Sequence, residues 1–199
     1  MAFTALFDAN VLHPASLRDL LVRVAASGLF RAKWSNEILD EVFDSVMRVN
    51  PDLDRSRLDV TRALMIKAVP DCLVSGYEPL IEAIELPDPD DRHVLAAAIR
   101  CNAGVIVTSN LKDFPAEVLE PYNIEAQSPD VFMLHLLEIA RDDVIMAMTK
   151  QAAALSRPPM TFDELLDRLG QVGLSRTIAT IRGKGNSAET QWLSGIPDL

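Results

Sequence analysis

The sequence has few cysteines, and its apolar runs are short. Cys72 and Cys101 are the two cysteines among 199 residues; two cannot form a disulfide framework, and they do not have the spacing of a zinc site. Uninterrupted apolar stretches such as 94–99 fall well short of the roughly 18–20 residues that a membrane span needs. The first residues lack a basic segment and reach Asp8 early, unlike a signal peptide. We therefore expect a reduced, cytoplasmic protein that does not associate with membranes.

Basic side chains are also scarce. The chain has 19 Lys and Arg against 29 Asp and Glu, which gives a formal net charge of −10. Residues 1–130 carry 12 basic and 21 acidic side chains and so hold most of this excess. A protein that bound nucleic acid through charge alone would usually be basic. Either the protein avoids phosphate groups, or some of its acids hold cations.

The composition is otherwise that of an ordinary globular protein, with 49% hydrophobic and 24% charged residues, which excludes wholesale disorder. The first two thirds of the chain alternate between short apolar segments and stretches with a helical period. This alternation is typical of a parallel sheet with helices on both faces. Strands are predicted at 2–7, 29–34, 71–75, 105–108 and 123–126, and helices at 14–27, 36–49, 54–68, 77–84 and 92–101.

After Pro129 the pattern becomes helical throughout. Helices are predicted at 131–155, 161–169 and 174–181. We expect three parts in all: a domain at 1–128, a helical extension at 129–182 and a flexible tail at 183–199. The extension could form the surface of a homodimer, a groove for a partner protein or an arm for the substrate, and the sequence does not choose among these.

Acidic and amide side chains follow two of the predicted strands. Asp8 comes directly after the first strand, and Asn110 and Asp113 follow the fourth. Ligands of parallel α/β sheets lie beyond the carboxyl ends of the strands. The run Asp88–Asp91 immediately precedes the helix that leads into the fourth strand. We therefore expect several carboxylates to converge at this edge of the sheet.

Carboxylates that converge in this way need a cation. Like charges at close range repel and raise one another's pKa, whereas oxygen ligands suit hard divalent ions such as Mg²⁺ or Mn²⁺. Such an ion can polarise a phosphodiester and activate a water molecule, which would reconcile an acidic chain with a polyanionic substrate. The alternative is that Asp8 only forms a turn and that the run 88–91 only caps the next helix.

Glu41 is the candidate carboxylate on the predicted helix 36–49. Ile38, Val42 and Val46 form the apolar stripe of this helix. At 3.6 residues per turn, Glu41 lies nearer to Ile38 than the other three acids of the helix do. It therefore borders the core, while the other acids point further into solvent.

Four segments together resemble the PIN-domain nucleases, a family that includes the VapC-type toxins. They are FDANVLHP, SNEILDEVF, PDPDDRHVLAAAI and VIVTSNLKDF, in the family's order, over about residues 1–125. The resemblance implies an α/β/α sandwich with a central parallel sheet. It also implies metal-dependent cleavage of RNA, with Mg²⁺ or Mn²⁺ held by three or four acids.

The resemblance assigns roles to residues of this sequence. Asp8 is the acid at the strand end, Glu41 is the last residue of an I-L-x-E pattern, and Asp91 is the last acid before the helix. These three are the implied catalytic residues and metal ligands. Asp88 is a frequent companion of Asp91, and Asn10 is implied to position a metal-bound water.

The fourth acidic position departs from the family pattern. The family commonly has Thr-x-Asp after the last core strand, whereas this chain reads Thr108-Ser109-Asn110. An amide oxygen can coordinate a metal but brings no charge. Asp113, three residues further on, could supply the missing carboxylate, and we expect Thr108 to form hydrogen bonds within the site. The sequence leaves open whether Asn110 or Asp113 makes the fourth metal contact.

The leading hypothesis is a Mg²⁺-dependent endoribonuclease, the toxin of a toxin–antitoxin pair, whose RNA target the sequence does not specify. A small antitoxin protein would then be its partner. A phosphohydrolase of the haloacid-dehalogenase type also has an Asp after its first strand, but it needs a second acid where Asn10 stands. A PIN-like module that binds without cleaving is a third hypothesis, favoured by Asn110. None of the three histidines, His13, His93 and His135, has the spacing of a zinc motif.

Overall fold

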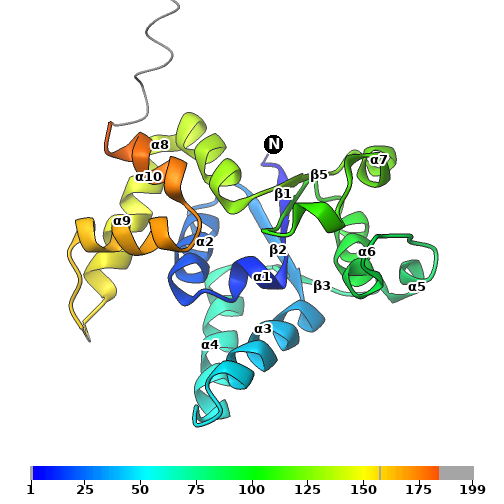
Figure 1. Ribbon diagram of the computed structural model, residues 1–199, viewed down its shortest axis with the longest axis horizontal. Helices are drawn as coiled ribbons and strands as arrows, with labels where there is room; N and C mark the ends of the chain where they lie inside the picture. Colours follow the sequence, from blue (N-terminus) through cyan, green and yellow to red (C-terminus); the bar gives the residue numbers. More distant parts are fainter. Residues whose placement is uncertain (1, 157, 184–199) are drawn as a thin grey trace, which may run out of the picture.

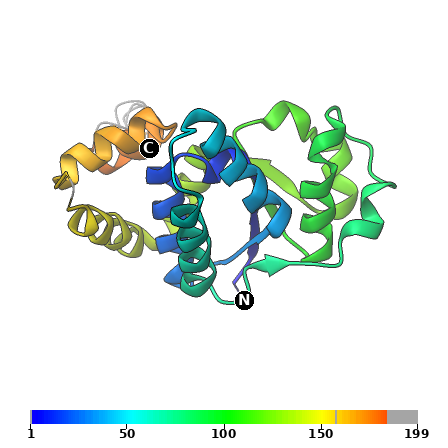
Figure 2. The same ribbon diagram turned by 90° about the horizontal axis from the view of Figure 1, so that it is seen from below.

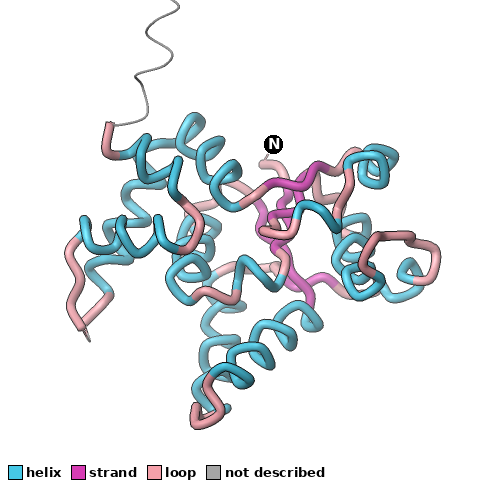
Figure 3. Tube along the Cα trace, in the orientation of Figure 1, coloured by secondary structure: helices cyan, strands magenta, loops and turns pink. Residues whose placement is uncertain are grey.

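The computed structural model describes residues 2–156 and 158–183 as a five-stranded parallel sheet between layers of helices (Figures 1 and 3). The strand order is β3-β2-β1-β4-β5, and every neighbouring pair is parallel. This confirms the expected α/β/α sandwich with a central parallel sheet. The strands are β1 (Thr4–Phe7), β2 (Arg31–Ser35), β3 (Leu73–Val74), β4 (Val105–Val107) and β5 (Glu125–Gln127).

The helices around the sheet follow the predicted ranges closely where the helical period is long. The sequence did not predict α1, α7 or the short 3₁₀ helices, because so few residues show no clear apolar period, and the helix predicted at 77–84 is shortened to a single turn. The helices up to the last strand are α1 (Ala9–Leu12), α2 (Ala15–Ala26), α3 (Asn36–Val49), α4 (Arg55–Ala68), α5 (Glu78–Ile81), α6 (Arg92–Arg100) and α7 (Ala116–Leu119), with 3₁₀ helices η1 (Pro89–Asp91), η2 (Leu111–Asp113) and η3 (Glu120–Tyr122).

Strand β1 is the middle strand and is covered on both faces. Its last three residues are completely buried, which is why the segment is a continuous apolar run rather than an alternating one. Leu6 of β1 pairs in register with Ile106 of β4. The backbone N–H of Asp8 donates to the carbonyl of Val107 at 3.1 Å. The ends of β1 and β4 therefore lie side by side, and the loops that leave them start from the same point.

Capping side chains fix the first residues of the helices that border the carboxyl ends of β1 and β4. The Ser35 hydroxyl accepts a hydrogen bond from the backbone N–H of Ile38 at 3.0 Å and begins α3. The carboxylate of Asp88 accepts one from the N–H of Asp90, also at 3.0 Å, and begins η1 just before α6. Each is a polar side chain at a helix start, where free backbone N–H groups need acceptors.

The C-terminal helices lie at one end of the molecule, beside α2, and α5 to α7 lie at the other end (Figures 1 and 2). They are α8 (Pro129–Ala154), α9 (Phe162–Gln171) and α10 (Ser175–Ile181). The expected single long helix is bent, because Ala140 leaves the helical conformation with φ −150° and ψ 60°. Thr161 and Glu164 form a capping box at the start of α9.

Two contacts join these helices to one another and to the sheet. The buried carboxylate of Asp130 accepts hydrogen bonds from the backbone N–H groups of Arg176, at 3.0 Å, and Thr177, at 2.8 Å, and so ties α10 to the start of α8. The ring of Phe132 packs edge-on against Phe30 of the sheet layer, with centroids 5.1 Å apart. The extension therefore shares a core with the rest of the molecule.

The division of the chain into a domain at 1–128, an extension at 129–182 and a tail at 183–199 stays a prediction. The expected tail beyond Gly183 lies outside the described residues. None of the helices within residues 2–156 and 158–183 has the length and hydropathy to cross a membrane.

Candidate metal centre and active site

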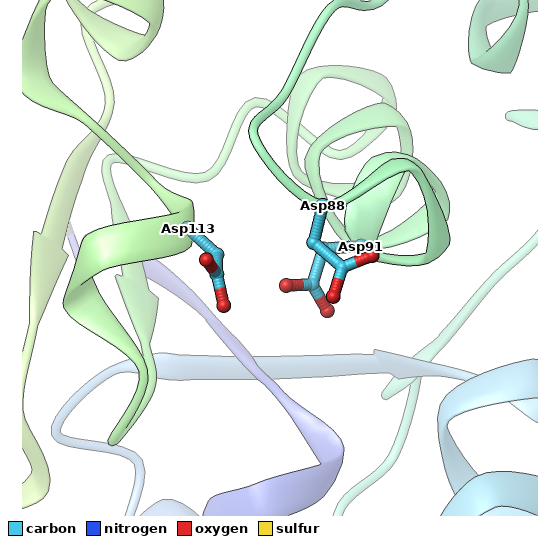
Figure 4. Close-up of side chains that lie close together, drawn as sticks. All are labelled: Asp88, Asp91 and Asp113. Carbon is cyan, nitrogen blue, oxygen red and sulfur yellow. The ribbon is translucent and has the colours of Figure 1, made fainter.

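Three carboxylates meet beyond the ends of β1 and β4. Asp88 and Asp91 come from η1, and Asp113 comes from η2, which follows β4. One oxygen from each of the three lies within 4.8 Å of the others. Figure 4 shows the side chains pointing toward one another from two separate elements. We call these three residues the carboxylate cluster.

Asp8 is buried at the end of β1 and is fixed by hydrogen bonds. Its Oδ1 accepts from the backbone N–H of Ala9 at 2.6 Å, and its Oδ2 accepts from the hydroxyl of Thr108 at 2.7 Å and from the amide of Asn10. Burial raises the pKa of Asp8, while the hydrogen bonds from Thr108 and Ala9 lower it and the charge of Glu41 raises it further. The result is a pKa above the ordinary value of an aspartate and a side chain held in one place.

Asn10 and Thr108 connect the loops that follow β1 and β4. The amide of Asn10 donates to the hydroxyl of Thr108 at 2.9 Å, and its carbonyl oxygen accepts from the backbone N–H of Ser109 at 2.8 Å. The Thr108 hydroxyl also accepts from the N–H of Asn110 at 3.0 Å. Asn10 therefore holds the two loops together, a structural role beside the one that the resemblance implied.

The structure places Asp113, rather than Asn110, in the carboxylate cluster. The side-chain amide of Asn110 donates to Oδ2 of Asp113. Asp113 is buried, so its charge has lost most of its contact with water. Asn110 thus orients Asp113, and of the two residues that the sequence left open, Asp113 lies with the other acids.

Glu41 lies on α3, apart from the carboxylate cluster. Its side chain is 45% exposed, and its Oε1 is 2.8 Å from Nε2 of His93, which is buried. The charge of Glu41 contributes to the raised pKa of Asp8, and that of Asp8 to the raised pKa of Asp91. Asp8 is thus coupled electrostatically to Glu41 and to Asp91, and of these three residues only Asp91 belongs to the cluster.

Within residues 2–156 and 158–183, no basic side chain forms an ion pair with the carboxylate cluster. Burial and the charges of Asp8, Asp88 and Asp113 raise the pKa of Asp91 to about 6, against a smaller lowering by His93. A carboxylate behaves in this way when it is partly buried among like charges. Oxygen donors of this kind and number are those that Mg²⁺ and Mn²⁺ prefer. The residues present therefore fit a hard divalent cation.

Sequence analysis assigned no role to His93, although its place near Asp91 makes it the best candidate among the three histidines. It stands two positions after Asp91, at the start of α6, and is 5% exposed. Burial lowers its pKa, but the hydrogen bond to Glu41 and the charges of Glu41, Glu37 and Asp8 raise it, and the net shift is upward. The sequence spacing of zinc ligands does not identify His93, because its partner Glu41 lies on another helix. Its place beside the acidic run was the available signal.

Comparisons with known proteins agree with this geometry. The family model of the PIN domain matches residues 4–112. The chain belongs to the PIN domain family. The match includes Asp8, Glu41 and Asp91 and ends one residue before Asp113. A second model, the VapC50 C-terminal domain, matches residues 129–183, which hold α8 to α10.

One relative of this PIN-domain protein carries a functional name. It is the "Putative ribonuclease VapC50" of Mycobacterium tuberculosis (strain ATCC 25618 / H37Rv), 45% identical over 96 residues. The aligned part covers 48% of this chain and 56% of the relative, so the chain spans little more than half the length of the curated relative it matches. No solved structure matches the chain significantly.

Proposed function

We propose that this PIN-domain protein is a Mg²⁺- or Mn²⁺-dependent endoribonuclease of the VapC type. The observation that carries the proposal is the carboxylate cluster beside the buried Asp8, at the carboxyl ends of β1 and β4. The similarity to a protein named as a ribonuclease supports RNA as the substrate. The proposed catalytic residues are Asp8, Glu41 and Asp91.

Four residues would hold the metal ion: Asp8, Glu41, Asp91 and Asp113, with Asp88 beside them. When bound, the ion would polarise the scissile phosphodiester and lower the pKa of a water molecule to make it a nucleophile. The protein contributes fixed positions: Thr108 and Asn10 hold the carboxylate of Asp8. Asn110 holds that of Asp113 in the same way. Carboxylates that are already oriented lose little rotamer entropy when they bind a cation.

The negative charges of the protein also influence which molecules can bind to it. A net charge of −10 repels RNA except where a cation neutralises the acids, so we expect RNA to approach at the cluster. A free ribonuclease in the cytoplasm needs restraint. We propose a small antitoxin protein that places a basic side chain among these carboxylates. The two free cysteines fit a reducing compartment.

Cleavage of a structured RNA by the purified protein tests the proposal. We expect cleavage with Mg²⁺ or Mn²⁺, none with EDTA, and a loss of at least about 100-fold in Asp91→Asn, since removing one metal ligand changes both charge and geometry. Asp90→Asn is the matched control, because Asp90 is exposed in the same acidic run and outside the cluster. Cleavage that persists in EDTA would contradict the metal-dependent mechanism.

Growth of cells that express the chain gives a second measurement. Expression alone should slow growth, and Asp91→Ala should relieve the effect while Asp90→Ala does not. Equal inhibition by the wild type and Asp91→Ala would mean that any toxicity is not catalytic.

Two other functions make different predictions. A PIN-like module without catalytic activity would bind Mg²⁺ and RNA but would not cut the RNA. The uncharged Asn110 favours this alternative. A haloacid-dehalogenase-like phosphohydrolase would need an acid at Asn10 and paired acids after a later strand. The amide of Asn10 is bonded to Thr108, and Asp142-Asp143 lie within α8, so the nuclease is the better proposal.

A further inference from the structure

The contact between His93 and Glu41 joins the two helices that carry candidate metal ligands. His93 lies at the start of α6, two residues after Asp91, and Glu41 lies in the middle of α3. Nε2 of His93 is 2.8 Å from Oε1 of Glu41. This distance is that of a short hydrogen bond to a charged acceptor.

Without this contact, Glu41 would be poorly fixed. Its side chain is 45% exposed, and a glutamate on a helix surface samples several rotamers, whose restriction costs conformational entropy. The imidazole ring, in contrast, is buried and cannot rotate freely. A bond from a packed ring to one carboxylate oxygen therefore selects one orientation of Glu41.

The environment of the other ring nitrogen strengthens this argument. Nδ1 of His93 is buried and has no hydrogen-bond partner among residues 2–156 and 158–183. The nearest carboxylate oxygen, Oε2 of Glu37, is 3.7 Å away and accepts a hydrogen bond from the hydroxyl of Tyr77 instead. A buried N–H without an acceptor is rarer and costlier than an unused lone pair. The hydrogen of a neutral ring therefore belongs on Nε2, and a charged ring carries it there too.

We propose that His93 is a positioning residue that holds the carboxylate of Glu41 in the orientation needed to bind the metal ion. The inference rests on the proposed function, since it takes Glu41 as a metal ligand. His93 touches neither the ion nor RNA in this role. It donates from Nε2 to Oε1, which leaves Oε2 of Glu41 available as a metal ligand. Residues that orient metal ligands typically contribute about 10–100-fold to metal affinity.

Calorimetric titration with Mg²⁺ alone, without RNA, tests this role in two variants of the full chain. In His93→Gln the amide nitrogen takes the place of Nε2 and can still donate, whereas in His93→Asn the shorter side chain stops short of Glu41. We expect His93→Gln to keep the affinity of the wild type and His93→Asn to lose about 10-fold. Melting in EDTA should show similar stability for the two variants, because both place an amide in the same site.

A double-mutant cycle separates positioning from a general effect on the site. If His93 acts through Glu41, adding His93→Asn to Glu41→Gln should cause little further loss of Mg²⁺ affinity. Equal affinities of the wild type and His93→Asn, or additive losses in the cycle, would overturn the role of His93 and leave the metal site standing. A wild type that binds no Mg²⁺ would overturn both the proposed function and this inference.

Discussion

The charge of Asp91 depends strongly on the groups that surround it. Its pKa is raised from 3.8 to about 6 by burial and by the charges of Asp8, Asp88 and Asp113. In the unfolded chain the same carboxyl keeps its ordinary value. The folded state therefore binds more protons than the unfolded state between these two values, and stability falls as the pH rises through them. Asp8, whose pKa is also raised, acts in the same direction.

We predict that this titration appears in melting curves of the metal-free protein. The melting temperature of the wild type should fall relative to that of Asp91→Asn as the pH rises from 3.8 to about 6, because only the wild type acquires the unfavourable charge. Adding Mg²⁺ near neutral pH should restore the wild type and not the variant. A difference between the two proteins that stays constant over this range would contradict the raised pKa of Asp91.

The pair Asn110 and Asp113 gives a second prediction at this scale. Asp113→Asn should weaken Mg²⁺ binding markedly, since it removes one of the three charges of the cluster. Asn110→Asp should strengthen it, because one more carboxylate then faces the ion, while the metal-free protein loses stability through repulsion between the acids at positions 110 and 113. Calorimetry and melting in EDTA measure these effects, with the exposed Glu117→Gln as control. No gain in affinity from Asn110→Asp would mean that position 110 does not face the metal.

The sequence predicts part of this site and not the rest. Asp8 and Asp91 are recognisable from the sequence because each adjoins an element with a clear apolar pattern. Asp113 joins Asp88 and Asp91 because of the turn η2, which has no sequence pattern of its own. The contact of His93 with Glu41 depends on how α3 packs beside α6. No spacing along one chain segment encodes a contact of this kind.

The observed helices and strands agree with the predicted ones where the apolar pattern extends over many residues. Helix α3 has the bounds that were predicted for it, since Ser35 caps its start and its apolar stripe is regular. Helix α1 was not predicted, because its four residues are a single turn begun by the side chain of Asp8. The bend at Ala140 was also not predicted. The segment around it has no proline or glycine to mark the bend.

At the scale of elements, we predict that Asp130 holds α10 in place. Asp130→Ala leaves the buried N–H of Thr177 and the partly buried N–H of Arg176 without their acceptor, which should cost about 1–3 kcal/mol of unfolding free energy. Asp142→Ala is the matched control, an exposed aspartate on the same helix, and should change stability by less than about 0.5 kcal/mol. Urea unfolding measures both, and equal effects would show that the cap contributes nothing.

The whole molecule has one core, to which the C-terminal helices contribute. Phe132 of α8 lies against Phe7 of β1 and Phe30, with ring centroids 6.0 Å and 5.1 Å apart. Gln151 of the same helix donates to the carbonyl of Ser16 in α2 at 2.8 Å. The segments before and after residue 128 share this core, so they can unfold together in a single step.

We predict that unfolding has one transition and that Phe132→Ala lowers the stability of the entire chain by about 3–5 kcal/mol, the cost of a large cavity in an aromatic core. Near-ultraviolet and far-ultraviolet circular dichroism in urea should give coincident curves. Ile139→Ala, at a side chain that is 71% exposed on the same helix, should have little effect. Two separate transitions, with only the second sensitive to Phe132→Ala, would mean that the extension unfolds independently.

The strand order also has a consequence for synthesis of the protein on the ribosome. Strand β1 is made first but lies in the middle of the sheet, between β2 and β4. Asp8 receives its hydrogen bond from Thr108, and the carboxylate cluster needs Asp113. At translation rates of about 5–20 residues per second, the second half of the site follows the first by roughly 5–20 s. During that interval the nascent chain contains Asp8 but neither Thr108 nor Asp113, so it has no complete site.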